Sequence, residues 1–147
     1  MNALILRALL IALMAPVARA ASDAPVVEVY KSSGCECCNR WIKHLKTHGF
    51  QVIAHNTNNV AAHKQRLGVP LGMGACHTAE VAGYLVEGHV PAKDIRRLLQ
   101  ERPRARGLAV PGMPMGSPGM EMGEHKDAYD VLLLAKDGTT TVFASHG

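Results

Sequence analysis

The chain has 147 residues, of which 16 are Lys or Arg and 12 are Asp or Glu, and only 4% are aromatic. Without Arg7 and Arg19 of the N-terminal segment, 14 basic and 12 acidic residues remain, a formal charge of +2. Such a weak charge, with no dense basic run and few aromatic rings to stack on bases, excludes a nucleic-acid-binding protein and predicts no nucleic-acid partner.

The first twenty residues have the pattern of a secretory signal peptide. An apolar run at residues 8–15 is followed by a small-residue exit at residues 18–20, as in a cleavable leader. The run is too short for a membrane anchor, which needs about 20 apolar residues. We therefore expect a signal peptide at residues 1–20 and one domain at residues 21–147, which is periplasmic and has no membrane association after cleavage.

Hydrophobic periodicity and turn residues predict alternating strands and helices in the mature chain. Strands are expected at residues 24–31, 50–54 and 79–86, and helices at residues 36–48, from Asn58 or Asn59 to Gly68, and from Pro91 as first helical residue to Pro103. The buried faces are expected to carry Val27, Val29, Trp41, Ile42, Leu45, Ile95, Leu98 and Leu99.

Two further segments follow the last of these helices. Residues 110–123, VPGMPMGSPGMEMG, are too rich in Gly and Pro for a regular element. The Asp137-Gly138 pair predicts a hairpin between residues 129–136 and 139–145, because Asp-Gly favours tight hairpin turns. Together the elements predict an α/β fold: a thioredoxin-like mixed sheet with flanking helices, a C-terminal β-hairpin and a Met/Gly/Pro-rich loop.

Four cysteines carry the strongest chemical signal. Cys35, Cys37 and Cys38 lie at the start of the first predicted helix, and Cys76 stands alone downstream. Pairing all four is easy only as Cys35–Cys38 with Cys37–Cys76, because the shorter pairings within the cluster are strained. Three hypotheses follow: a metal site, a thiol–disulfide oxidoreductase that uses Cys35 and Cys38, or two plain disulfides. We favour the metal site, and with it a metal-binding protein rather than an enzyme, because an oxidoreductase does not need the third thiol of Cys37.

The type of ligand favours copper. A helix N-terminus stabilises thiolates, and soft sulfur ligands select copper(I), zinc or iron–sulfur clusters. The adjacent Cys37 and Cys38 fit one tetrahedral zinc poorly, but they can bridge several copper(I) ions. The methionines of residues 110–123 favour copper(I) too, and Met113 and Met115 are candidate ligands. Zinc is the alternative metal, and methionines that merely pack as flexible hydrophobes are the alternative for the loop.

Cys76 and His77 precede the third predicted strand, and in a thioredoxin-like sheet this loop faces the start of the first helix. Cys76 is therefore a candidate fourth ligand, and His77 either binds the metal or orients a ligand through a hydrogen bond. The other histidines are scattered. His44 and His48, four residues apart, are interpreted as a polar helix face, and His146 beside the last strand is a weaker ligand candidate.

Three stretches, YKSSGCECCNRW, GACHTAEVAGYLVEGHVPAKDIRRLL and GLAVPGMPMGSPGMEM, resemble a family of small exported bacterial metal-binding proteins with a Cys-x-Cys-Cys motif. The family was long described as a domain of unknown function and includes periplasmic copper-resistance protein CopG. The resemblance implies a thioredoxin-like fold and a thiolate-bridged copper site at Cys35, Cys37 and Cys38, with Cys76 as the separate cysteine. It also implies a role in copper tolerance with redox cycling of the bound copper, and as partners metal ions and other periplasmic copper-handling proteins.

Overall fold

A computed structural model describes residues 24–147, so the predicted signal peptide lies outside the described part of the chain. The elements are β1 (Val27–Lys31), α1 (Glu36–Thr47), β2 (Val52–Asn56), α2 (Val60–Leu67), β3 (Thr78–Val81), β4 (Tyr84–Glu87), α3 (Ala92–Glu101), β5 (Gly107–Ala109), β6 (Tyr129–Leu134) and β7 (Thr140–His146). Within residues 24–147, no helix combines the length and apolar character that a membrane span requires.

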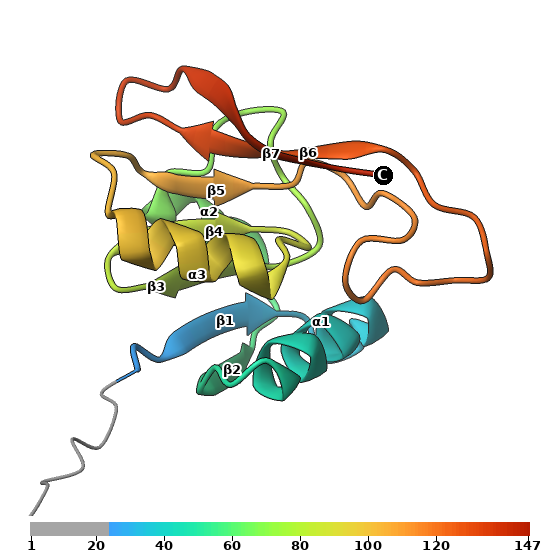
Figure 1. The fold of residues 1–147 in the computed structure, drawn as a ribbon. Helices are drawn as coiled ribbons and strands as arrows, with labels where there is room; N and C mark the ends of the chain where they lie inside the picture. The colour runs from blue at the N-terminus through green and yellow to red at the C-terminus, as the bar shows by residue number, and fades with distance from the viewer. Residues whose placement is uncertain (1–23) are drawn as a thin grey trace, which may run out of the picture.

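The strands form one mixed sheet in the order β2-β1-β3-β4-β5-β6-β7. The pairs β1–β2 and β4–β5 are parallel, and the other neighbours are antiparallel. Helices α1 and α3 lie on one face of the sheet and α2 lies on the other (Figure 1). The predicted thioredoxin-like mixed sheet with flanking helices is therefore confirmed, and so is the C-terminal hairpin, formed by β6 and β7.

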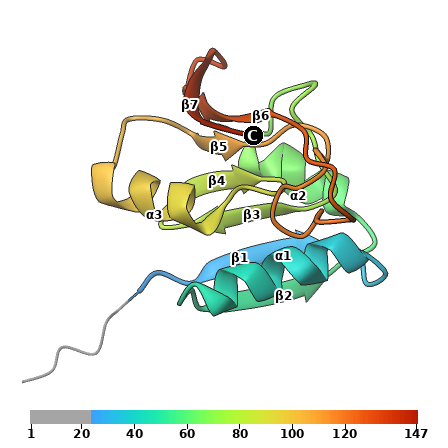
Figure 2. The ribbon, with the colours of Figure 1, turned by 45° about the vertical axis from the view of Figure 1, so that its right-hand side comes forward.

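Side chains that alternate along the central strands fill two separate layers. Val86 and Leu108 point toward α1 and α3 and belong to the larger core, whereas Leu85 and Ala109 belong to a smaller core with Leu67 at the end of α2. This alternation follows from the period of two in a strand. Figure 2 shows the sheet between the two helical layers.

Most predicted elements are present close to their expected bounds. Trp41, Ile42 and Leu45 form the buried face of α1, as predicted. The Asn59 side chain accepts a hydrogen bond from the Ala62 N–H at the start of α2, which is ordinary N-cap chemistry. Features of this kind depend on residues that are close together in the sequence, and they can therefore be predicted from it.

The prediction of one strand at residues 79–86 is wrong. Ala82 and Gly83 form a two-residue turn between β3 and β4, and both have left-handed backbone, with φ of 49° and 82°. Tight hairpin turns of this kind usually carry Asn-Gly or Asp-Gly, so Ala-Gly within an apolar run gave no turn signal. The short β5 was also missed, because three residues show no periodicity.

The start of α3 also differs from the prediction. Pro91 is the N-cap with extended backbone, and the helix begins at Ala92. The Ala92 N–H donates to Nε2 of His44 on α1, over 3.0 Å. A histidine of one helix therefore caps the next, which gives one member of the His44–His48 pair a structural role.

This cap predicts a stability that depends on pH. Burial lowers the pKa of His44, with a smaller contribution from nearby His48. Because the unfolded chain, with a histidine pKa of about 6.5, binds more protons, stability is complete above that pH and is lost as pH falls through the lowered pKa of the folded state. The expected result is a lower urea midpoint in the metal-free protein at about pH 5.5 than at about pH 7.5. The drop should be smaller in His44→Gln, and an equal drop in both proteins would contradict this role.

Candidate metal centre

The topology of the sheet brings the four cysteines together. Cys35 is the N-cap of α1, directly after the turn that ends β1, and Cys37 and Cys38 lie in the first helical turn. Strand β3 runs antiparallel to β1, with Thr78 opposite Tyr30. The loop that enters β3 therefore lies beside the end of β1, and it places Cys76 at the start of α1.

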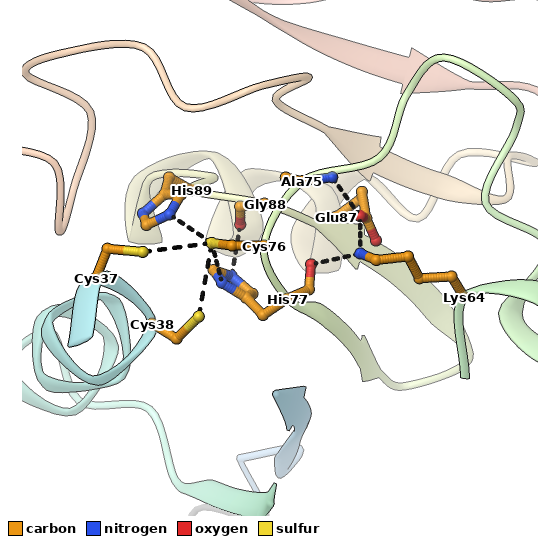
Figure 3. A network of polar contacts seen from close by, with 9 residues as sticks. All are labelled: Cys37, Cys38, Lys64, Ala75, Cys76, His77, Glu87, Gly88 and His89. Carbon is orange, nitrogen blue, oxygen red and sulfur yellow. Dashed lines mark hydrogen bonds and ion pairs between the residues drawn. The ribbon is translucent and has the colours of Figure 1, made fainter. Parts of the chain in front are cut away.

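The four sulfur atoms form one cluster, of which Figure 3 shows Cys37, Cys38 and Cys76. The Cys76 Sγ lies 3.5 Å from both the Cys37 Sγ and the Cys38 Sγ, and the Cys35 and Cys37 sulfurs are 3.6 Å apart. Cys35 and Cys38 form a disulfide with a Cα–Cα distance of 5.3 Å, whereas Cys37 and Cys76 are free thiols. Of the two disulfides considered from the sequence, the structure contains only this one.

The environment of Cys76 keeps its sulfur protonated when no metal is present. Burial, followed by the interaction with Cys37, raises the pKa of the Cys76 thiol to about 12. A metal ion that binds this sulfur must therefore displace a proton.

His89, which the sequence left among the scattered histidines, contacts the cluster directly. Its Nδ1 lies 2.7 Å from the Pro118 carbonyl oxygen, and its Nε2 lies 3.1 Å from the Cys76 Sγ. Since a carbonyl only accepts, Nδ1 carries the proton, and the lone pair of Nε2 faces the sulfur. Burial lowers the pKa of His89, so the ring is neutral and free to bind a metal.

His77 is oriented in the same way from the other side of Cys76. Its Nε2 donates to the Gly88 carbonyl oxygen over 2.9 Å, which leaves the Nδ1 lone pair 3.4 Å from the Cys76 Sγ. The ring is fully buried against Trp41, and burial lowers its pKa well below the usual range. Cys76, His77 and His89 thus form a second group of possible ligand atoms that shares Cys76 with the four-sulfur cluster.

The β3–β4 hairpin explains why sequence reasoning missed His89. Thr78 pairs with Glu87, so the residues just outside this pair, Cys76-His77 and Gly88-His89, also lie side by side. If residues 79–86 formed a single strand, Cys76-His77 and Gly88-His89 would lie at its opposite ends. A recognised turn at Ala82-Gly83 was the signal that could have placed His89 next to Cys76.

A buried ion pair holds the Cys76 loop in position. Glu87 is fully buried, pairs with Lys64 of α2, and accepts a hydrogen bond from the Ala75 N–H over 2.8 Å. Lys64 also donates to the His77 carbonyl oxygen over 3.2 Å. The pair therefore fixes the residues on both sides of Cys76 (Figure 3).

The Met/Gly/Pro-rich loop covers the other side of the cluster. It contains no regular element, as predicted, but part of it is buried against α1. Pro118 and Gly119 are buried, and the Gly119 carbonyl accepts a hydrogen bond from Arg40 Nε over 2.9 Å. In Figures 1 and 2 the loop descends from the top of the sheet to the start of α1.

The two candidate methionines lie in this loop before its buried part. Met113 is 50% exposed. Met115 is half-buried, and its N–H donates to the Asp127 carboxylate over 2.8 Å. Both remain predicted ligands. His146, the weaker candidate, pairs with Asp94 at 2.7 Å.

Comparison with known proteins identifies a matching family model and similar solved structures. A family model described as "Protein of unknown function, DUF411" matches residues 73–120. The solved structure "Copper resistance protein copG- Form 2" is 48% identical, covers 85% of this chain and 100% of its own, and has a TM-score of 0.81. "Copper resistance protein copG- Form 1" is 50% identical, covers 82% of this chain and 96% of its own, and has a TM-score of 0.78.

The chain belongs to the CopG-like DUF411 family. No curated protein matches it. The segment matched by the DUF411 model contains Cys76, His77, His89 and the buried part of the loop. The Cys-x-Cys-Cys segment lies before that match.

Proposed function

We propose that this chain is an exported, periplasmic copper-binding protein of copper resistance, which holds copper(I) through Cys35, Cys37, Cys38 and Cys76. The observation that carries the proposal is the convergence of these four sulfurs, all within 4.8 Å of one another. The names of the two similar solved structures support copper as the metal. The leader-like pattern at residues 1–20 supports export.

The donor set favours copper(I) over zinc. All four sulfurs are soft ligands, and Cys37 lies within 3.6 Å of Cys35 and within 3.5 Å of Cys76. Because one thiolate can bridge two copper(I) ions, such closely spaced sulfurs suit a cluster of several ions. Zinc also binds thiolates, but the adjacent Cys37 and Cys38 fit one tetrahedral zinc ion poorly. His77 and His89 each place the lone pair of a ring nitrogen beside Cys76, and imidazole is a metal ligand of intermediate softness.

Copper binding at this site is coupled to the redox state of the cysteines. The Cys35–Cys38 disulfide must accept two electrons before both sulfurs can bind as thiolates, and Cys76 must lose its proton. We further propose that copper bound at this site undergoes redox cycling, and we expect Met113 and Met115 to assist capture or exchange of the ion.

The test is the copper content of protein purified from copper-fed cells under reducing conditions. Cys37→Ser should lose most of the bound copper, because it removes a thiolate that lies close to both Cys35 and Cys76. The matched control is Glu36→Gln, a neighbouring exposed residue without a sulfur, which should retain the wild-type copper content. Equal copper in Cys37→Ser and in the wild type would overturn the proposal.

A thiol–disulfide oxidoreductase is the second candidate function, and the Cys35–Cys38 disulfide at the start of α1 favours it. Helix N-termini activate such cysteines in disulfide exchange. This function predicts disulfide reductase activity that survives Cys37→Ser and replacement of Met113 and Met115 by Leu. Titration of free thiols with and without copper(I) separates the two functions, because only the copper site protects Cys37 and Cys76.

A further inference from the structure

A groove lies at the end of the β3–β4 hairpin that is remote from the cysteines. Two adjoining cavities of about 250 and 400 Å³ share Gly83, Tyr84, Ala105 and Lys136 among their lining residues. The groove therefore runs between the hairpin turn and residues 102–106, which connect α3 to β5.

The groove is basic and its charges are uncompensated. Its cationic lining residues are Arg102, Arg104, Arg106 and Lys136. Among the ion pairs between described residues, none includes any of these four cations. The acid that lines the groove, Glu80, already accepts hydrogen bonds from Arg66 over 3.1 Å and from the Tyr30 hydroxyl over 3.0 Å.

Backbone strain is concentrated at the same place. Among residues 24–147, only Ala82 and Arg102 have left-handed backbone without being glycine, with φ of 49° and 47°. Both line the groove. The Ala82 conformation belongs to the β3–β4 turn and that of Arg102 to the C-cap of α3, so both help to fix the backbone that lines the groove.

We propose that this groove binds an acidic, carboxylate-rich peptide segment of a partner protein. Guanidinium groups bind carboxylates with two parallel hydrogen bonds, and Leu67, Tyr84 and Pro103 add apolar surface to the lining. The charges line a hollow, which a protruding peptide segment can enter and the flat surface of a bilayer cannot. Ala82 lies six positions after Cys76, about 20 Å of extended chain, so a bound partner leaves the cysteine cluster accessible.

The test is binding of a fluorescent poly-glutamate peptide to the full protein at an ionic strength of about 0.15 M. Arg104→Glu with Lys136→Glu should weaken binding about tenfold or more. Lys43→Glu with Lys46→Glu is the matched control, because it reverses two exposed charges on α1, and it should change affinity less than about twofold. Urea unfolding verifies the fold of the groove variant and of the control variant. The double variant Arg104→Gln with Lys136→Gln neutralises the two groove charges without reversing them, and it tests the same contact with a smaller change.

Three outcomes would overturn the proposal. The first is an equal loss of affinity in the groove variant and the control, which would show that only net charge matters. The second is an absence of peptide binding by the wild type. The third is binding of phosphatidylglycerol vesicles, but not of the peptide, that depends on Arg104 and Lys136, because that result would assign the groove to a membrane surface.

Discussion

A Lys64→Met variant should lose about 3–5 kcal/mol of its free energy of unfolding, because the substitution leaves a buried carboxylate without its counter-ion. Glu87 is fully buried, and one of its two carboxylate oxygens already has no hydrogen-bond partner. Only the Ala75 N–H would remain to stabilise the other oxygen. Urea unfolding of the metal-free protein measures the loss.

The control for this prediction is the double variant Lys64→Met with Glu87→Gln. It removes both charges and keeps an acceptor for the Ala75 N–H, so it should recover most of the lost stability. A double variant as unstable as the single variant would show that packing of the lysine, and not its charge, holds the loop.

The ion pair also has a consequence for the candidate metal centre. Lys64 and Glu87 contact the backbone on both sides of Cys76, so the single variant should release that loop. We expect the Cys76 thiol to react faster with a thiol reagent in Lys64→Met than in the wild type, and the double variant should react at an intermediate rate.

Gly119→Ala should displace the Met/Gly/Pro-rich loop from the start of α1. Gly119 has a φ of 91°, and an added Cβ would lie 2.8 Å from both the Cys37 carbonyl oxygen and the Trp41 nitrogen, and 3.2 Å from Nδ1 of His89. Two of these three atoms belong to the backbone of α1, which cannot move cheaply. We expect a loss of about 2–4 kcal/mol from strain and overpacking together, and faster reaction of the Cys37 thiol.

The same loop contains matched controls. Gly112 and Gly123 also have positive φ, of 71° and 76°, but a Cβ at either position would meet no atom within 4 Å. Gly112→Ala and Gly123→Ala should therefore cost about 1 kcal/mol from backbone strain alone and leave the reactivity of Cys37 unchanged. Equal effects at Gly119 and at these two positions would contradict docking of the loop against the candidate metal centre.

Much of the fold could be predicted because its signals are local. The apolar face of α1, the Asn59 cap of α2 and the Asp137-Gly138 turn each depend on residues within a few positions of one another. The same holds for the cluster of Cys35, Cys37 and Cys38 at a helix start, since one turn of helix and the preceding turn bring these sulfurs together. The expected place of Cys76 depended on the strand order of a thioredoxin-like sheet, and this order is present.

The sequence by itself thus determined the type of fold and the sulfur chemistry of the candidate centre. Only the tertiary structure decided what surrounds those sulfurs. His89 reaches Cys76 through the register of the β3–β4 hairpin, whose Ala82-Gly83 turn lacks the usual residues. Pro118 reaches His89 across 29 positions of sequence. Contacts of this kind leave no periodic trace in the chain, because they depend on how separate elements pack and not on the order of neighbouring residues.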